Sequence, residues 1–294
     1  MKRESELAGV LAIVAAGLGI DFVSGRVLAA FYAQTGHASW LGIGLAAMMY
    51  GLVTGMIVHM ARRCGAQSVT QLLNRLPGGG MGKGAHALYG FILVLAMGML
   101  LRSAGHMGAL VLPVRRADLL GGALALLAAG VIAFAGERSV KTVGVLLVLL
   151  MIGFEIALLM LAQVPETFHY EIELRLKDNW IAAVGFALLH AAACLCLSAG
   201  LTVRFSGGRV RAGYMGVWAG LVYGCMLAAG NAALMARDER ILVLKLPFVA
   251  LSAGWGSVGF YLNAGLNWLF CVFAMAGLVY GLMPVCSRAK SLGK

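Results

Sequence analysis

The feature that most constrains the fold is a series of apolar runs, each roughly 20 residues long, that recur along nearly the whole chain. A run of this length, wound as an α-helix, crosses the hydrocarbon core of a bilayer. The composition agrees, because only 12% of the residues are charged, against about a quarter in a soluble domain. The chain is therefore predicted to be an all-α, polytopic transmembrane helical bundle, and the lipid bilayer is its first predicted partner.

Eight spans are expected, all belonging to one integral membrane domain over residues 1–294. Their approximate ranges are 7–32, 40–62, 86–112, 119–135, 141–163, 179–203, 212–236 and 256–284. Residues 241–252 are interrupted by Lys245 and Pro247, so they are predicted to form an amphipathic segment that lies on or dips into the membrane surface. The first run is too long for the core of a cleaved signal peptide and is expected to stay in the protein.

The net charge of +11 comes from basic residues dispersed in short loops between the apolar runs. With the N-terminus inside, fourteen of the 23 Lys and Arg residues fall on the cytoplasmic side and seven fall outside, while Arg26 and Arg102 lie within spans. Such a bias sets the orientation of a membrane protein. We therefore expect both termini in the cytoplasm and no binding to nucleic acid.

The sequence lacks the common signatures of a metal site or an enzyme. Its six cysteines show no paired spacing, which argues against disulfides and zinc. It contains no HExxH, no Gly-x-Ser-x-Gly and no pair of carboxylates in a cytoplasmic loop. The segment GAQSVTQLLNRLPGGGMGKG, residues 65–84, departs from a phosphate loop at Pro77 and Gly84. We expect no metal, no organic cofactor and no enzymatic activity.

Ionisable side chains within the spans are candidates for function, because they are costly in lipid. At a helical rise of roughly 1.5 Å per residue, Asp21, Arg102 and Glu155 fall at similar depths in spans one, three and five. We expect these three, together with Arg26, to form a buried charge network facing a cavity between those spans. The alternative is a structural salt bridge that specifies packing and binds no substrate. His106, one turn beyond Arg102 on the same face, is expected beside the network.

The stretch AGLGIDFVSGRVLAAFY, residues 16–32, combines charge with a weak helix propensity. Gly17 and Gly19 precede Asp21, and Ser24–Gly25 follow it. In transporters, a helix broken near the membrane midplane frees backbone groups that bind substrate and ions. We therefore expect the first span to be a broken helix.

A second, less marked break is expected in the sixth span, at HAAACLCLSAGL, residues 190–201. Ser198 and Gly200 lie in the inner part of this stretch. His190, near the middle of the span, is either part of a binding site or a histidine hydrogen-bonded within the bundle. Other polar residues expected to form hydrogen bonds between helices are Asn231, Asn263 and Asn267.

The first span keeps a recognisable pattern of residues. The stretch GIDFVSGRVLAAFY resembles the GAGFASGQE stretch and the following aromatic pair of the YkvI-like bacterial membrane proteins, a branch of the amino acid–polyamine–organocation (APC) superfamily with the LeuT-type fold. The positions that match are Gly19, Phe22, Ser24, Gly25 and the pair Phe31–Tyr32. The segments SVTQLLNRLPGGGMGKG and SAGHMGAL are also similar to the family. The resemblance implies a bacterial cytoplasmic membrane protein.

The chain also departs from the family pattern. Asp21 replaces a glycine, Arg26 a glutamine and Val27 a glutamate, and Ala193–Cys194 stand where the sixth span usually has Tyr-Asn. The family usually completes two five-span repeats, whereas eight spans imply a LeuT-like inverted repeat truncated to about 5+3. These departures put a transport cycle like that of complete members in question.

These features predict a secondary transporter that moves a small amino-acid-like or other small polar solute by alternating access, coupled to Na⁺ or H⁺. The alternative is a membrane sensor, binding component or accessory subunit on the same scaffold, without transport. The residues expected to bind solute or ion are Gly19, Asp21, Ser24, Gly25, His190 and Ser198. Those expected to gate the site or tune its charge are Arg26, Arg102, His106 and Glu155.

Overall fold

The computed structural model describes residues 2–19, 22–75, 79–161, 179–207, 211–236 and 239–283. Within these ranges every regular element is a helix, and seven of the helices are long and apolar enough to cross a membrane. The seven are α3 (Ala38–Cys64), α5 (Gly79–Val111), α6 (Ala117–Phe134), α7 (Glu137–Leu161), α8 (Trp180–Phe205), α9 (Ala212–Met235) and α11 (Ser257–Leu282). The chain is thus a multi-pass membrane protein built as a helical bundle, as predicted.

The first span is split into two helices, α1 (Lys2–Gly17) and α2 (Arg26–Phe31). Between them the chain turns, and Gly25 takes a left-handed conformation with φ 79° directly before α2 begins. A residue without a Cβ adopts this conformation at little cost. The predicted break in the first span is therefore present, with Ile20 and Asp21 outside the described residues.

The sixth span shows no break, because α8 runs unbroken through residues 190–201. The hydroxyl groups of Ser198 and Thr202 donate to carbonyl oxygens of their own helix, those of Cys194 (2.9 Å) and Ser198 (3.0 Å) respectively. Gly200 serves close packing instead of a turn, since a Cβ there would lie 3.0 Å from the Cα atom of Gly281 in α11. The expected second break was wrong because the single glycine is used as a helix contact.

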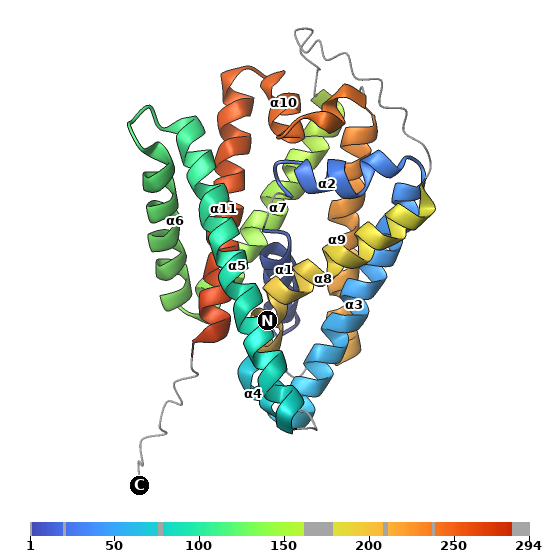
Figure 1. Cartoon of the computed structure of the whole chain (residues 1–294), viewed down its shortest axis with the longest axis vertical. Coiled ribbons are helices and arrows are strands. Elements are labelled where there is room, and N and C mark those ends of the chain that lie inside the picture. The colour runs from blue at the N-terminus through green and yellow to red at the C-terminus, as the bar shows by residue number, and fades with distance from the viewer. Residues whose placement is uncertain are drawn as a thin grey trace.

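The helices form two groups with the first span between them. Figure 1 shows α5, α6 and α11 together on one side, α3, α8 and α9 on the other, and α1 and α7 in the middle. Helix α11 packs against α5 and α6 and also reaches α1, α7 and α8. The broken span is therefore surrounded by other helices rather than by lipid.

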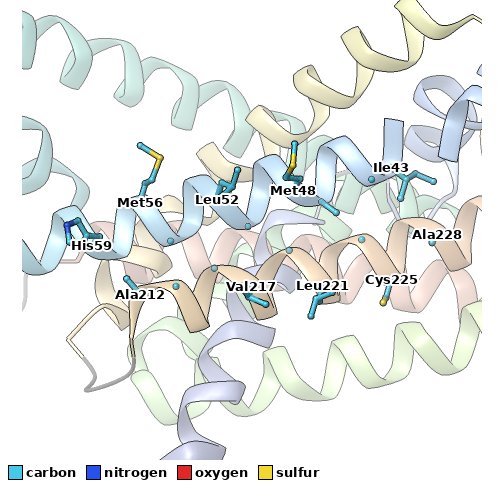
Figure 2. A pocket seen from close by; sticks show the side chains of 18 of the residues that line it. Ile43, Met48, Leu52, Met56, His59, Ala212, Val217, Leu221, Cys225 and Ala228 are labelled. Atoms are coloured by element: carbon cyan, nitrogen blue, oxygen red, sulfur yellow. The ribbon is translucent and has the colours of Figure 1, made fainter. Parts of the chain in front are cut away.

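Helices α3 and α9 approach each other through glycines. A Cβ at Gly51 would lie 2.8 Å from the carbonyl oxygen of Gly216, and one at Gly220 would lie 2.7 Å from that of Ala47. Small residues allow this close crossing of membrane helices. Along the outside of the pair runs an apolar groove of about 910 Å³, shown in Figure 2, whose walls carry larger side chains such as Met56 and Leu221.

The segment predicted to lie at the membrane surface consists of two short helices, η2 (Glu239–Val243) and α10 (Pro247–Ala253). Neither is long enough to span the membrane. The side chains of Phe248 and Leu251 are fully buried, and α10 packs against α2, α7 and α11. The segment is therefore covered by protein and lies against the broken span, because its apolar side chains fill the space beside the break.

Candidate functional site

The break in the first span is packed closely on two sides. At Gly19 a Cβ would overlap with the methyl group of Ala274 in α11 and would lie 3.3 Å from the carbonyl oxygen of Phe270. At Gly25 a Cβ would lie 2.8 Å from the ring of Phe248 in α10. Gly19 and Gly25 were predicted to line the site, and here they let the unwound backbone meet α11 and α10 directly.

Backbone groups freed by the break bond to other elements. The side-chain amide of Asn263 in α11 donates to the carbonyl oxygen of Val23 at 3.3 Å, and the backbone N–H of Phe248 donates to that of Ser24 at 2.9 Å. The side-chain amide of Asn267 in turn donates to the Asn263 side-chain oxygen at 3.0 Å. In a membrane core every backbone polar group needs such a partner. Helices α11 and α10 thus supply the hydrogen-bond donors for the backbone of the break.

A buried hydrogen-bond network centres on His190 in α8. Its Nδ1 lies 2.9 Å from the hydroxyl of Tyr32, which follows α2, and 3.0 Å from the hydroxyl of Tyr223 in α9. Its Nε2 lies 3.4 Å from the thiol of Cys194, one turn along α8. His190 is therefore a histidine hydrogen-bonded within the bundle, and it connects the C-terminal half of the first span to α8 and α9.

A third tyrosine connects the N-terminal half of the first span to the same network. The hydroxyl of Tyr50 in α3 lies 3.2 Å from the carbonyl oxygen of Ile13 in α1 and 3.0 Å from the Ser198 hydroxyl in α8. Its ring stacks on that of Tyr223, with centroids 4.3 Å apart. A Cβ at Gly17 would lie 2.8 Å from the Tyr50 hydroxyl oxygen, so this glycine makes room for the contact.

The two tyrosines in the apolar runs and Cys194 were not singled out from the sequence. Tyr50 and Tyr223 each lie among apolar residues with no distinctive spacing around them. A usable signal exists on α8, where polar side chains recur every four residues and so share one face. The residues of this polar stripe are His190, Cys194, Ser198 and Thr202.

The expected charge network is not formed as predicted. Arg26, Arg102 and His106 do come together, but their side chains are exposed and line a pocket of about 1020 Å³ with Asp118 and Lys245. Glu155 does not line this pocket and has no hydrogen-bond partner among the described residues, so the expectation that Arg102 and Glu155 belong to one network was wrong. Depth along a helix gives the height of a side chain but not the direction in which it points. Asp21, the fourth expected member, lies outside the described residues.

Glu155 lies instead among packed residues of three other elements, α9, α2 and α10. The side chain is fully buried, and neither carboxyl oxygen has a hydrogen-bond partner among the described residues. It points at Gly230 of α9, where a Cβ would lie 2.9 Å from Oε1 and 3.3 Å from the ring of Phe248, and would overlap with Leu28 of α2. An ionisable group placed in this way within a membrane protein marks a functional site by default.

Asn231 on α9 forms the interhelical hydrogen bond expected of it. Its side-chain amide donates to the hydroxyl of Ser39 in α3 at 3.1 Å. The described part of the chain holds no group of three or more His, Cys, Asp or Glu side chains placed to bind a metal ion.

Comparison with known proteins adds no relative to this picture. No protein-family model matches the chain, and a search of the curated proteins finds no significant match. The function of this chain is therefore inferred from its fold and from the geometry around the break.

Proposed function

We propose that this membrane protein is a secondary transporter, related to the YkvI-like branch of the APC superfamily, that moves a small polar solute by alternating access. The observation that carries the proposal is the broken first span, whose backbone carbonyls at Val23 and Ser24 bond to α11 and α10 instead of to their own helix. Breaks of this kind in transporters supply backbone groups for solute and ion.

The two halves of the first span share some neighbours and differ in others. Both pack against α8 and α9, while α1 also packs against α7 and accepts a hydrogen bond from Tyr50 at the Ile13 carbonyl oxygen. Helix α2 also packs against α10 and η2, and Tyr32 at its end bonds to His190. A break between two halves with partly different contacts can act as a hinge. A hinge at this place is compatible with alternating access, which supports the proposal.

The solute site is proposed at the break and the adjoining face of α8, with Gly19, Ser24 and Gly25 contributing backbone groups. His190 and Ser198 lie in the neighbouring polar stripe. Asp21 is proposed to carry the counter-charge or the coupled ion, which is Na⁺ or H⁺. Glu155 is a second proposed proton carrier, because its buried carboxyl contacts Gly230 and lies beside α2 and α10.

The test starts from a thermal-shift screen of the purified protein against amino acids, polyamines and nucleobases, with and without sodium. A ligand that binds the folded state raises its melting temperature. Uptake of each hit is then measured in proteoliposomes for the wild type, Asp21→Asn and, as a control at an exposed carboxylate outside the proposed site, Glu137→Gln at the start of α7. We expect Asp21→Asn alone to abolish uptake while eluting as a folded monodisperse protein. Unchanged uptake would remove Asp21 from the mechanism.

The second proposed function is a membrane sensor or binding component that does not transport. The close seating of Gly19 on Ala274 and of Gly25 on Phe248 favours it, because these contacts hold the break firmly against α11 and α10. Saturable binding of a solute without any flux in proteoliposomes would establish this second function and exclude the first.

A further inference from the structure

The pocket that brings Arg26, Arg102 and His106 together has an unusual charge balance. Lys245, in the stretch between η2 and α10, adds a fourth basic side chain, and Asp118 at the start of α6 is the one acidic residue among its described lining residues. The basic side chains come from three separate segments of the chain, α2, α5 and the stretch before α10. Three permanent cations therefore outnumber one carboxylate around a shared cavity.

Charged side chains within a membrane span cost free energy, and those that occur there mark functional sites. Arg102 lies within Gly84–Val111, the part of α5 that is long and apolar enough to cross a membrane. Cationic side chains within a membrane span face a water-filled cavity or a counter-charge. Here they face a cavity of about 1020 Å³, at the upper end of the sizes found for small-molecule sites.

The chemistry of the lining matches an anion. Arginine presents a planar fork of N–H donors that fits a carboxylate or a phosphate with two parallel hydrogen bonds. Low-dielectric walls around charges of one sign focus the field into the cavity and raise the local concentration of the opposite charge. The walls between the basic groups are apolar and include Met99, Leu119 and Leu126. An anionic group attached to an apolar body satisfies both kinds of surface.

We propose that this pocket binds the carboxylate or phosphate group of an amphiphilic anion, held between Arg26 and Arg102. Because Arg26 directly follows Gly25 in the chain, the anion lies at the outer edge of the break. The inference deepens the proposed transport function by naming its solute class, and it rests on that function only for passage of the anion across the membrane. The anion is either a free organic solute or the headgroup of an anionic lipid.

The experiment measures binding to the full-length protein in nanodiscs of phosphatidylcholine alone. Benzoate and phenyl phosphate are the probes, and benzamide is the neutral control of the same shape as benzoate. We expect saturable binding of the two anions by calorimetry and none of benzamide. Arg102→Gln is expected to weaken binding at least tenfold, whereas Arg138→Gln at the start of α7, outside the pocket, leaves it unchanged.

Two further variants keep the test decisive if Arg102→Gln does not fold. Arg26→Gln removes the second guanidinium group, and tenfold weaker binding of the anions is expected. Asp118→Asn removes the repelling carboxylate, and binding is expected to become several times tighter, which general damage to the fold does not produce. Equal binding of benzoate and benzamide, or wild-type affinity in both Arg26→Gln and Arg102→Gln, would overturn the inference.

The lipid arm repeats the measurement in nanodiscs that contain phosphatidylglycerol, with native mass spectrometry of retained lipid. If a lipid headgroup occupies the pocket, the wild type retains phosphatidylglycerol, Arg102→Gln loses it, and benzoate competes with it. If a free solute occupies the pocket, benzoate binds equally in both kinds of nanodisc. If the protein does not transport, these binding results still stand. If it binds benzoate and benzamide equally, the inference is wrong, and transport through the break is still tested by the uptake measurements.

Discussion

The first and sixth spans lie side by side in the bundle and both carry polar residues, yet only the first is broken. Along α8, Ser198 and Thr202 hydrogen-bond to carbonyl groups of their own helix. In the first span, the carbonyl groups of Val23 and Ser24 bond to α11 and α10. The comparison shows that polar side chains alone do not break a membrane helix. The break in the first span combines glycines at close contacts with hydrogen-bond donors from other helices.

Gly19→Val is expected to have the largest effect, a loss of about 3 kcal/mol in the free energy of unfolding or no folded protein at all. A side chain at this position overlaps with Ala274 of α11, which cannot move away while its helix stays packed. Thermal unfolding followed by fluorescence-detected size exclusion measures the loss. The control is Gly185→Val in α8, where no atom lies near the added Cβ, and equal stability of the two variants would contradict the account of the break.

His190→Phe is expected to cost about 2 kcal/mol, because it leaves the buried hydroxyls of Tyr32 and Tyr223 without their shared partner. Helix α8 is expected to stay helical by circular dichroism, since the network does not maintain its backbone. Adding Tyr223→Phe to this variant should recover part of the loss, which a double-mutant cycle measures. A fully additive cycle would show that the histidine and tyrosine act independently. His59→Phe, on the exposed side of α3, is the control.

Asn263→Leu is expected to cost about 1 kcal/mol, because it removes the donor to the Val23 carbonyl oxygen. Amide hydrogen exchange at residues 22–25 should accelerate, since the backbone at Val23 loses its hydrogen bond to α11. Asn267→Leu is the matched control, because that side chain bonds only to Asn263 among the described residues. An identical exchange pattern in the two variants would show that the bond to Val23 does not hold the break.

Thr202→Val is expected to have the smallest effect, less than about 1 kcal/mol, since it removes one bond within α8 and keeps the shape of the side chain. Urea-dependent unfolding in mild detergent compares it with Asn263→Leu. A loss as large as that of Asn263→Leu would mean that α8 depends on its side-chain bonds, and the contrast between the two spans would then disappear.

The sequence predicted the bundle and the broken first span because both follow from local signals. Seven of the eight expected spans coincide with the seven long helices, and the first is instead divided into α1 and α2, with Gly17, Gly19 and Gly25 marking the break. The tyrosine network was missed because Tyr50 and Tyr223 meet only through packing of α3 on α9. A periodic pattern shows which side chains share a face of one helix, but not which other helix that face meets.

The prediction of one charge network was wrong because depth along the chain does not show which neighbouring helix a side chain faces. Arg102 and Glu155 were expected together because they lie at similar depth, yet one lines the basic pocket and the other points at Gly230. The error about the sixth span has another origin, since Gly200 is indistinguishable in sequence from a glycine that opens a turn. Its role is decided by Gly281, which lies far along the chain in α11.

The hydrogen bonds that hold the break have a consequence for how the protein is made. Val23 and Ser24 are synthesised more than 200 residues before their donors Asn263 and Phe248. The first span therefore enters the membrane before these two donors exist, and lipid penalises backbone groups that lack such partners. It reaches its final form only after α10 and α11 have been synthesised, so a chain that stops before α10 is expected to be recognised and degraded by membrane proteases.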